Sequence, residues 1–134
     1  MEDDAAKQLH LQMIQTVINR LANSSFLLKG WSVVLVSGLF ALAAKDTKPL
    51  FVYIAYFPCA VFWALDGYFL WQERQYRGLY DTVRQFQPKN IDYSMDTSQM
   101  TGTLLAAVFS KTLMAFHGAV VFTVIIVMMT LLLR

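Results

Sequence analysis

The chain has 134 residues, of which 57% are apolar, 14% aromatic and 15% charged. Soluble globular domains are about 45–50% apolar and about 25% charged, so this composition argues against a large soluble enzyme or a disordered chain and indicates an integral membrane protein. The formal net charge of +2 is too small to indicate nucleic-acid binding by itself. A single cysteine, Cys59, excludes an intrachain disulfide, and because the sequence has no Cys/His cluster with zinc spacing, we expect no metal site and no cofactor.

The first 25 residues are predicted to form a cytoplasmic amphipathic helix. Apolar side chains recur there at spacings of three and four and form a stripe about 120° wide: Leu11, Ile14, Val17, Ile18 and Leu21. The opposite face carries uncharged amides: Gln8, Gln12, Gln15 and Asn19. Amides can bond across subunits, line a wet pore or pair with adenine edges, which makes these four candidates for ligand binding. The alternative is a solvated face or a helix end covered by neighbours.

Three apolar runs are long enough to cross a hydrocarbon core of about 30 Å, which takes about 20 helical residues. They are residues 26–44, 50–71 and 103–133, and the last is expected to enter the membrane only near Met114. Because the acidic start does not resemble a secretory signal, we expect the first run to be an uncleaved anchor. Basic residues concentrate before it and in residues 72–102, so the positive-inside rule predicts that both segments are cytoplasmic. Lys45, Lys48 and Arg134 are expected on the outer side.

The helix stops predict rods that are longer than the bilayer. Residues 5–44, 50–87 and 97–134 are predicted as three helices of about 40 residues, each about 55–60 Å long and nearly half cytoplasmic. Pro88 ends the second rod, and side-chain oxygens at residues 96–98 are expected to cap the third. The sequence therefore predicts a single all-α membrane domain, a bundle of three transmembrane helices with long cytoplasmic extensions, which assembles into an oligomer.

The extension of the second rod carries a second apolar stripe, which consists of Tyr76, Leu79, Tyr80, Val83 and Phe86. We expect the two stripes to pack on each other, on the start of the third helix or on a second subunit. The other face carries Arg74, Arg77 and Arg84, which could converge on a phosphate-bearing ligand. Glu73 with Arg77 and Arg77 with Asp81 are expected as ion pairs one turn apart. The alternative for this face is a basic extension that contacts lipid headgroups.

Three polar residues are predicted to share one level inside the membrane. Lys29, Asp66 and His117 lie 16, 16 and 17 residues from the outer end of their spans, or about 24–26 Å deep. Lys29 and Asp66 are natural partners for an ion pair, and His117 is a third member that can change its charge with pH. A pair that fixes helix register, or snorkelling of Lys29, competes with a charged ring at the cytoplasmic mouth of a pore. Lys111, about two turns further, completes the set of pore or gating candidates.

Catalytic motifs are missing from the sequence. It contains no nucleophile elbow, HExxH, Walker loop or paired carboxylates, and His10 and His117 have no companion ligands nearby in the sequence. We therefore do not expect an enzyme. Small residues at fourfold spacing, Ser37 with Ala41 and Ala115 with Ala119, permit close contact between helices.

Long strings of the sequence carry a family resemblance: HLQMIQTVINRLANSSFLLKGWSVVLVSGLFALAAKD, FWALDGYFLWQERQYRGLYDTVRQ and IDYSMDTS. They resemble small bacterial membrane proteins of anti-phage defence operons, most of all the membrane effectors of Hailong-type systems. The resemblance implies a homo-oligomeric ion channel of the inner membrane, with a tetramer as the favoured assembly. It further implies that a single-stranded oligodeoxyadenylate, made by a partner nucleotidyltransferase, holds the channel closed until infection removes the signal.

The expected function is therefore a homo-oligomeric channel or pore-forming effector of anti-phage defence, gated by a cytoplasmic nucleotide or single-stranded oligonucleotide. Its opening would disrupt the inner membrane and arrest the infected cell. Two alternatives remain at this stage. One is a non-conducting membrane scaffold that recruits a cytoplasmic partner, and the other is a small proton-coupled exporter that uses Asp66 as its membrane carboxylate.

Overall fold

The computed structural model describes residues 1–46 and 48–133, and 84% of these residues are helical. Its elements are α1 (Glu2–Asp46), α2 (Leu50–Gln85), a 3₁₀ turn (Pro88–Asn90), α3 (Leu104–Val108) and α4 (Lys111–Leu132). No strand forms within these described ranges. Thr47 lies outside them, as does Arg134, which was expected on the outer side. The prediction of an all-helical chain is confirmed.

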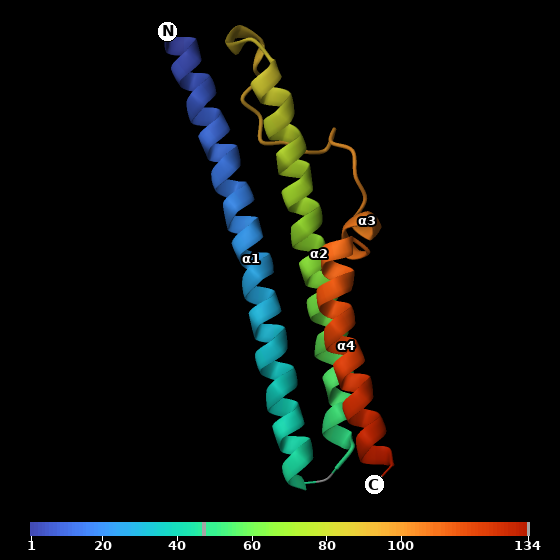
Figure 1. Ribbon diagram of the computed structural model, residues 1–134. Helices are drawn as coiled ribbons and strands as arrows, with labels where there is room; N and C mark the ends of the chain where they lie inside the picture. Colours follow the sequence, from blue (N-terminus) through green and yellow to red (C-terminus); the bar gives the residue numbers. More distant parts are fainter. Residues whose placement is uncertain (47, 134) are drawn as a thin grey trace.

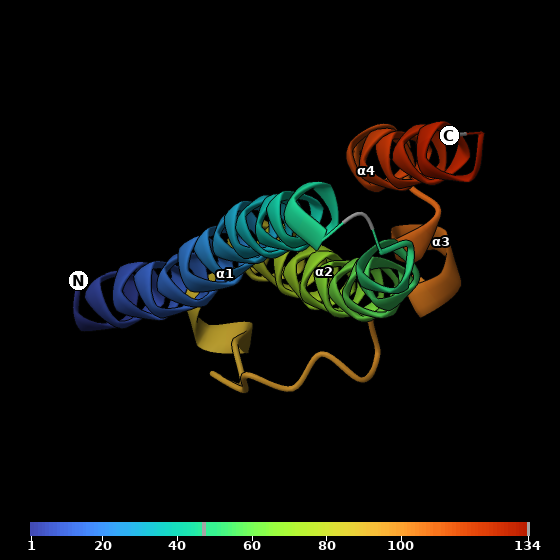
Figure 2. The same cartoon turned by 90° about the horizontal axis from the view of Figure 1, so that it is seen from below.

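The bundle has two ends that contain different sets of helices (Figure 1). α1 and α2 lie side by side and antiparallel, whereas α4 lies beside only the half of α2 that is closer to the turn between α1 and α2. Seen from below, α1 and α2 lie side by side, and α4 is set apart from the N-terminal part of α1 (Figure 2). Both α1 and α4 contact α2 more than they contact each other. We call residues 27–46, 50–70 and 111–132 the three-helix end, and residues 2–25 and 71–85, with the connection 86–103, the two-helix end.

Helix lengths match this division. With 45 and 36 residues, α1 and α2 are about 67 and 54 Å long, while the 22 residues of α4 span about 33 Å, close to the thickness of a hydrocarbon core. All three helices are long and apolar enough to cross a membrane. At the three-helix end large apolar side chains face outward, for example Phe57, which is 75% exposed, and Phe122, which is 63% exposed. A surface of this kind indicates a membrane protein.

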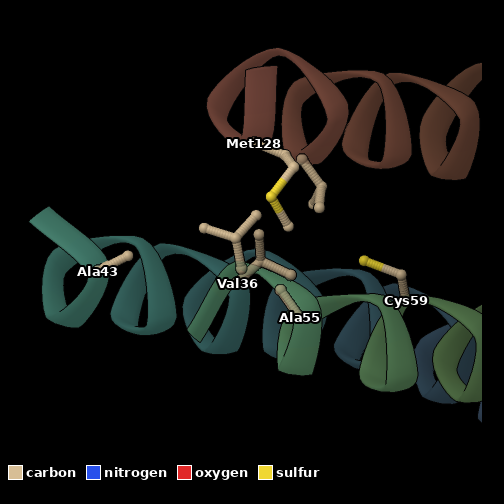
Figure 3. Close-up of a cluster of buried hydrophobic side chains, with 7 residues drawn as sticks. Val36, Ala43, Ala55, Cys59 and Met128 are labelled. Carbon is tan, nitrogen blue, oxygen red and sulfur yellow. The ribbon is translucent and has the colours of Figure 1, made fainter. Parts of the chain in front are cut away.

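A small apolar core joins the three helices at this end. Val36 and Ala43 of α1 meet Ala55 and Cys59 of α2 and Met128 of α4 (Figure 3). The residues are mostly small, which lets α1 and α2 approach closely at this end. This core therefore fixes α4 against α2 in the half of the bundle that lies furthest from the N-terminus.

The two-helix end has a separate core. Ile14 and Ile18 of α1 are buried against Leu79 and Val83 of α2, so the structure shows the first of the three expected packings, in which the two apolar stripes contact each other. The third layer of this core is not a helix. Ile91, Met95 and Met100 of the connection cover it instead.

The prediction that the third rod starts near residue 97 is wrong. Residues 97–103 are not helical, and the caps are Thr103, which accepts a hydrogen bond from the backbone N–H of Ala106, and Ser110, which accepts one from Leu113. Side chains of the connection form local turns: Asp92 accepts from the N–H of Ser94, and Asp96 accepts from that of Ser98. Such bonds compete with helix formation. The hydrogen bonds from the backbone and the hydroxyl of Ser98 also lower the pKa of Asp96.

Gly67 positions α3 against α2. A Cβ atom at Gly67 would overlap the Val108 side chain and would lie 3.1 Å from the Cα of Val108, so only glycine permits this approach. The indole N–H of Trp63 donates to the carbonyl of Val108 at 2.9 Å, and that of Trp71 donates to the carbonyl of Gly102 at 3.3 Å. The chain consequently breaks between α3 and α4 at a point that is bound directly to α2.

Candidate functional site

A buried polar network joins all three long helices where the three-helix end meets the two-helix end. Its centre is the carboxylate of Asp66 on α2, which is fully buried. Lys29 of α1 lies 2.6 Å from Oδ2 of Asp66, and Nε2 of His117 on α4 lies 2.8 Å from the same oxygen. The structure thus brings together the three residues that the sequence placed at one level, and the ion pair between Lys29 and Asp66 is confirmed.

Ser25 completes the network. Its hydroxyl donates to Oδ1 of Asp66 and accepts a hydrogen bond of 2.8 Å from the ammonium of Lys29. Ser25 and Lys29 are one turn apart on α1, so both reach the same carboxylate. An ionised carboxylate can only accept, which requires that Nε2 of His117 carry a proton. The carboxylate is therefore held by donors from two other helices, and Asp66 links α1 to α4, which otherwise have few contacts.

Aromatic rings surround the network and limit the access of water. The ring of Trp63 stacks on His117 at 5.7 Å between centroids, and the ammonium of Lys29 lies 5.9 Å from the centroid of Phe116. His117 is 1% exposed, whereas the Lys29 side chain is 19% exposed. Lys29 and the partly buried Ser25 are the members nearest the surface, where the lysine cation can also find water or a headgroup.

Lys111 lies apart from this network. It is exposed in the first turn of α4, six residues before His117. Six helical residues correspond to about 9 Å along the axis, so Lys111 lies closer to the two-helix end, as its sequence position predicted. The structure gives it no part in the contacts that surround Asp66.

A groove runs between α1 and α2 at the two-helix end, on the side opposite the connection. One section, of about 290 Å³, is lined by Gln8, Leu11, Gln12, Gln15 and Tyr80. A neighbouring section of about 220 Å³ shares Gln15 and Tyr80 and adds Arg77 and Asp81. The structure thus brings three of the four predicted amides together with one of the predicted arginines. Asn19 lies one turn further and accepts a hydrogen bond of 3.0 Å from Gln15.

The three arginines do not converge as the sequence predicted. Arg74 donates to the carbonyl of Ala106 at 3.4 Å, and Arg84 pairs with Asp81 at 3.1 Å. Arg77 pairs with Glu73 at 2.7 Å, as expected, but its predicted pair with Asp81 is replaced by the pair between Asp81 and Arg84. Alternating carboxylates balance the charge of this face. Arg77 is the single arginine of the three that lines the groove.

Sequence reasoning missed two residues with structural roles at these sites. Ser25 was not selected, although its position four residues before Lys29 on a helix places both on one face. Lys7 donates to the carbonyls of Arg84 and Phe86, at 2.9 and 2.7 Å, and so binds the start of α1 to the last turn of α2. Nothing in the local sequence points to a contact between segments so far apart. Cations near helix C-termini are favoured by the helix dipole.

The comparisons with known proteins find no match to this chain among family models, curated proteins or solved structures.

Proposed function

We propose that the protein is a homo-oligomeric ion channel of the bacterial inner membrane, with its N-terminus in the cytoplasm. It would be gated at the two-helix end by a nucleotide or a single-stranded oligonucleotide and would act as an effector of anti-phage defence. Support for the defence role comes from the sequence strings that resemble Hailong-type effectors. The observation that carries the gating proposal is the buried Asp66 network at the junction of the two ends.

A conducting path would have to lie between copies of the chain. Asp66 and His117 are buried inside one copy, between its own helices, so neither faces an open channel within the subunit. We therefore assign these two residues to gating and not to the lining of the pore. Charges buried in a membrane are costly unless they are paired, and paired charges that connect separate helices give an assembly two distinct arrangements, bound and released.

The two long helices provide a direct connection from the groove to the network. Gln15 and Lys29 are 14 residues apart on α1, and Arg77 and Asp66 are 11 residues apart on α2, which corresponds to about 21 and 17 Å. Both helices are continuous between these points. A ligand that changed the spacing of α1 and α2 at the groove would shift Lys29 relative to Asp66 and so favour one gating state.

The groove has the chemical groups that a nucleotide requires. Gln8, Gln12 and Gln15 each offer a donor and an acceptor to a base edge, and Tyr80 offers a ring for stacking. Arg77 is 59% exposed, and its pair with Glu73 is of a type that contributes only about 0.2–1 kcal/mol, so a phosphate can compete for it. Asp81 is the one acidic group in the lining and would limit how many phosphates approach.

The alternatives receive less support. An exporter needs a carboxylate that can exchange its partners with cargo, but the carboxylate of Asp66 is occupied by Ser25, Lys29 and His117. A non-conducting scaffold makes a separate prediction, since loss of the Asp66 charge would then change only the stability of the assembly. We keep the scaffold as the alternative that the following experiment distinguishes.

The direct test is ion flux through liposomes that contain the purified full-length chain. We expect a potassium flux that an oligodeoxyadenylate suppresses more strongly than an oligodeoxycytidylate of equal length. Asp66→Asn should change the flux in assemblies of unchanged size, whereas Asp3→Asn, a change at an exposed carboxylate outside the groove lining, should not. The absence of flux with and without oligonucleotide would refute the channel, and a change restricted to assembly would favour the scaffold.

Binding of the oligonucleotide can be tested separately from flux. Arg77→Gln should weaken binding and lower the slope of affinity against salt by about 0.7, the contribution of one phosphate on a single strand. Arg74→Gln is the matched control, because Arg74 bonds to α3 and lies outside the groove lining. Equal effects of the two changes would exclude the groove as the ligand site.

A further inference from the structure

One exposed face of α1 in the two-helix end consists of uncharged residues and is bordered by the exposed Arg20, four residues after Thr16. Its members recur at spacings of three and four: Leu9, Gln12, Thr16, Asn19 and Asn23. All five are exposed, and Leu9 is 60% exposed although it lies outside the segment expected in the membrane. The outer face of α2 at the same end differs, since it carries Glu73, Arg77, Asp81 and Arg84, as a solvated helix does.

The same face continues through the three-helix end. Its members there are Leu27, Gly30, Val34, Ser37 and Ala41, all of them exposed. A Cβ atom at Gly30 would meet no heavy atom within 4 Å, so the backbone is open on this side. Small residues at such spacing let helices approach closely in a membrane. We call these ten residues the uncharged strip; it follows α1 from the water-exposed end into the apolar end.

We infer that the uncharged strip is the surface on which copies of this chain associate, α1 against α1. Copies of the chain that are inserted in one membrane with the same topology are parallel. An interface near the symmetry axis of their assembly therefore places each residue opposite the same residue of the neighbouring copy. Identical charges would repel there, whereas amides and hydroxyls carry both a donor and an acceptor and can bond to their own kind. Thr16 and Asn19 meet this requirement, and Gln12 lies where the uncharged strip borders the groove. The inference rests on the self-assembly in the proposed function but not on conduction.

Other occupants explain only part of the strip. Lipid chains would cover Gly30 and Val34 but leave Leu9 and the amides in water. A different protein would not need groups that pair with themselves, and charges on α1 would then be tolerated if the partner opposed them. The composition of the uncharged strip resembles that of a coiled-coil interface with a few polar positions, in which a buried asparagine specifies the register and the number of helices.

The inference can be tested by disulfide cross-linking of the full-length chain in membranes. The one native cysteine is removed by Cys59→Ala, and single cysteines are then introduced at the exposed sites. Thr16→Cys, Asn19→Cys and Val34→Cys lie in the uncharged strip, while Arg84→Cys on α2 and Ile126→Cys on α4 are exposed controls outside both the strip and the groove lining. We expect oxidant-dependent dimers from the strip and few from the controls.

Several outcomes would overturn the inference. They are cross-linking at the controls that equals or exceeds that of the strip, and a chain that stays monomeric in nanodiscs. Efficient cross-links in a chain that shows no ion flux would leave the interface in place and refute the channel. Ion flux from an assembly that cross-links through α4 would support the channel and refute the α1 interface. The failures of the two proposals are therefore distinguishable.

A change of charge gives an independent measurement. Asn19→Glu places like charges at the seam and should weaken association by about tenfold or more, whereas Arg84→Glu on α2, outside the groove lining, should not. Co-expression of the Asn19→Glu and Asn19→Lys chains should restore mixed assemblies. A general folding defect would not be rescued in this way, so the absence of rescue together with a normal size for Asn19→Glu alone would contradict the inference.

Discussion

Replacing Asp66 by Asn removes the charge to which donors from α1 and α4 are bound, while it keeps the shape of the side chain. The carboxylate is fully buried and has Ser25, Lys29 and His117 as partners. Removal of one member of a buried ion pair costs about 3–5 kcal/mol, because its partner is left without compensation. We expect Asp66→Asn to lower the free energy of unfolding by this amount and to loosen α4 from the other helices.

The structure also predicts how the partners combine. Lys29→Met leaves the fully buried carboxylate of Asp66 with only Ser25 and His117, so its cost should also be about 3–5 kcal/mol, because the charge that loses its partner has no access to water. The double variant should cost less than the sum of the two single variants, with a coupling of about 1 kcal/mol or more, because both remove one interaction. Asp81→Asn, an exposed carboxylate paired with Arg84, is the matched control and should cost below about 1 kcal/mol.

Unfolding of the detergent-solubilised chain by denaturant provides the assay. Tryptophan fluorescence is a suitable signal because Trp63 stacks on His117 and its indole bonds to the carbonyl of Val108. The reasoning would be refuted if Asp66→Asn and Asp81→Asn had equal effects. It would also be refuted if the effects of Lys29→Met and Asp66→Asn were simply additive.

Three further predictions concern contacts at the ends of helices: the packing of α3 on α2, the N-terminal cap of α4 and the hydrogen bonds from Lys7 to the end of α2. Gly67→Ala should lower the free energy of unfolding by about 1–3 kcal/mol, since the added Cβ would overlap Val108. Gly118→Ala should be neutral or stabilising, because a Cβ there would have no heavy atom within 4 Å. Thermal unfolding compares the two variants, and equal values would contradict the close approach of α3 to Gly67. Ser110→Ala should cost about 0.5–2 kcal/mol by removing the cap of α4, and retention of full stability would show that the cap is dispensable. Lys7→Met should increase hydrogen exchange in the last turn of α2, because the lysine binds its carbonyls; unchanged protection there would exclude that role.

The helical periodicity of apolar residues predicted which side chains form the core of the two-helix end. The apolar positions Ile14, Ile18, Leu79 and Val83 follow helical periodicity, and the structure packs them together. Depth counting likewise placed Lys29, Asp66 and His117 at one level, where they meet. These predictions succeeded because helix geometry is regular, so sequence distance converts directly into distance along the bundle.

Features for which two local interactions compete could not be predicted in the same way. The Arg77 and Asp81 pair expected from spacing is displaced by the pair between Asp81 and Arg84, because two spacings compete for one carboxylate. The helix start predicted near residue 97 lies at Leu104, since aspartate and serine side chains bond to nearby backbone N–H groups. A cap and a turn draw on the same residue types, and the sequence alone does not separate them.

The sequence by itself determined that the chain is helical, that three helices are apolar enough to cross a membrane, and that a few polar residues share one level within them. Hydropathy and helical period are sufficient for this, because both act locally along each helix. Only the tertiary structure decided that Ser25 completes the Asp66 network, that α4 joins the other helices at one end, and that residues 86–103 cover the other. These features depend on which faces meet, and that choice is made by the packing of residues far apart in the chain, such as Gly67 with Val108 and Lys7 with the end of α2.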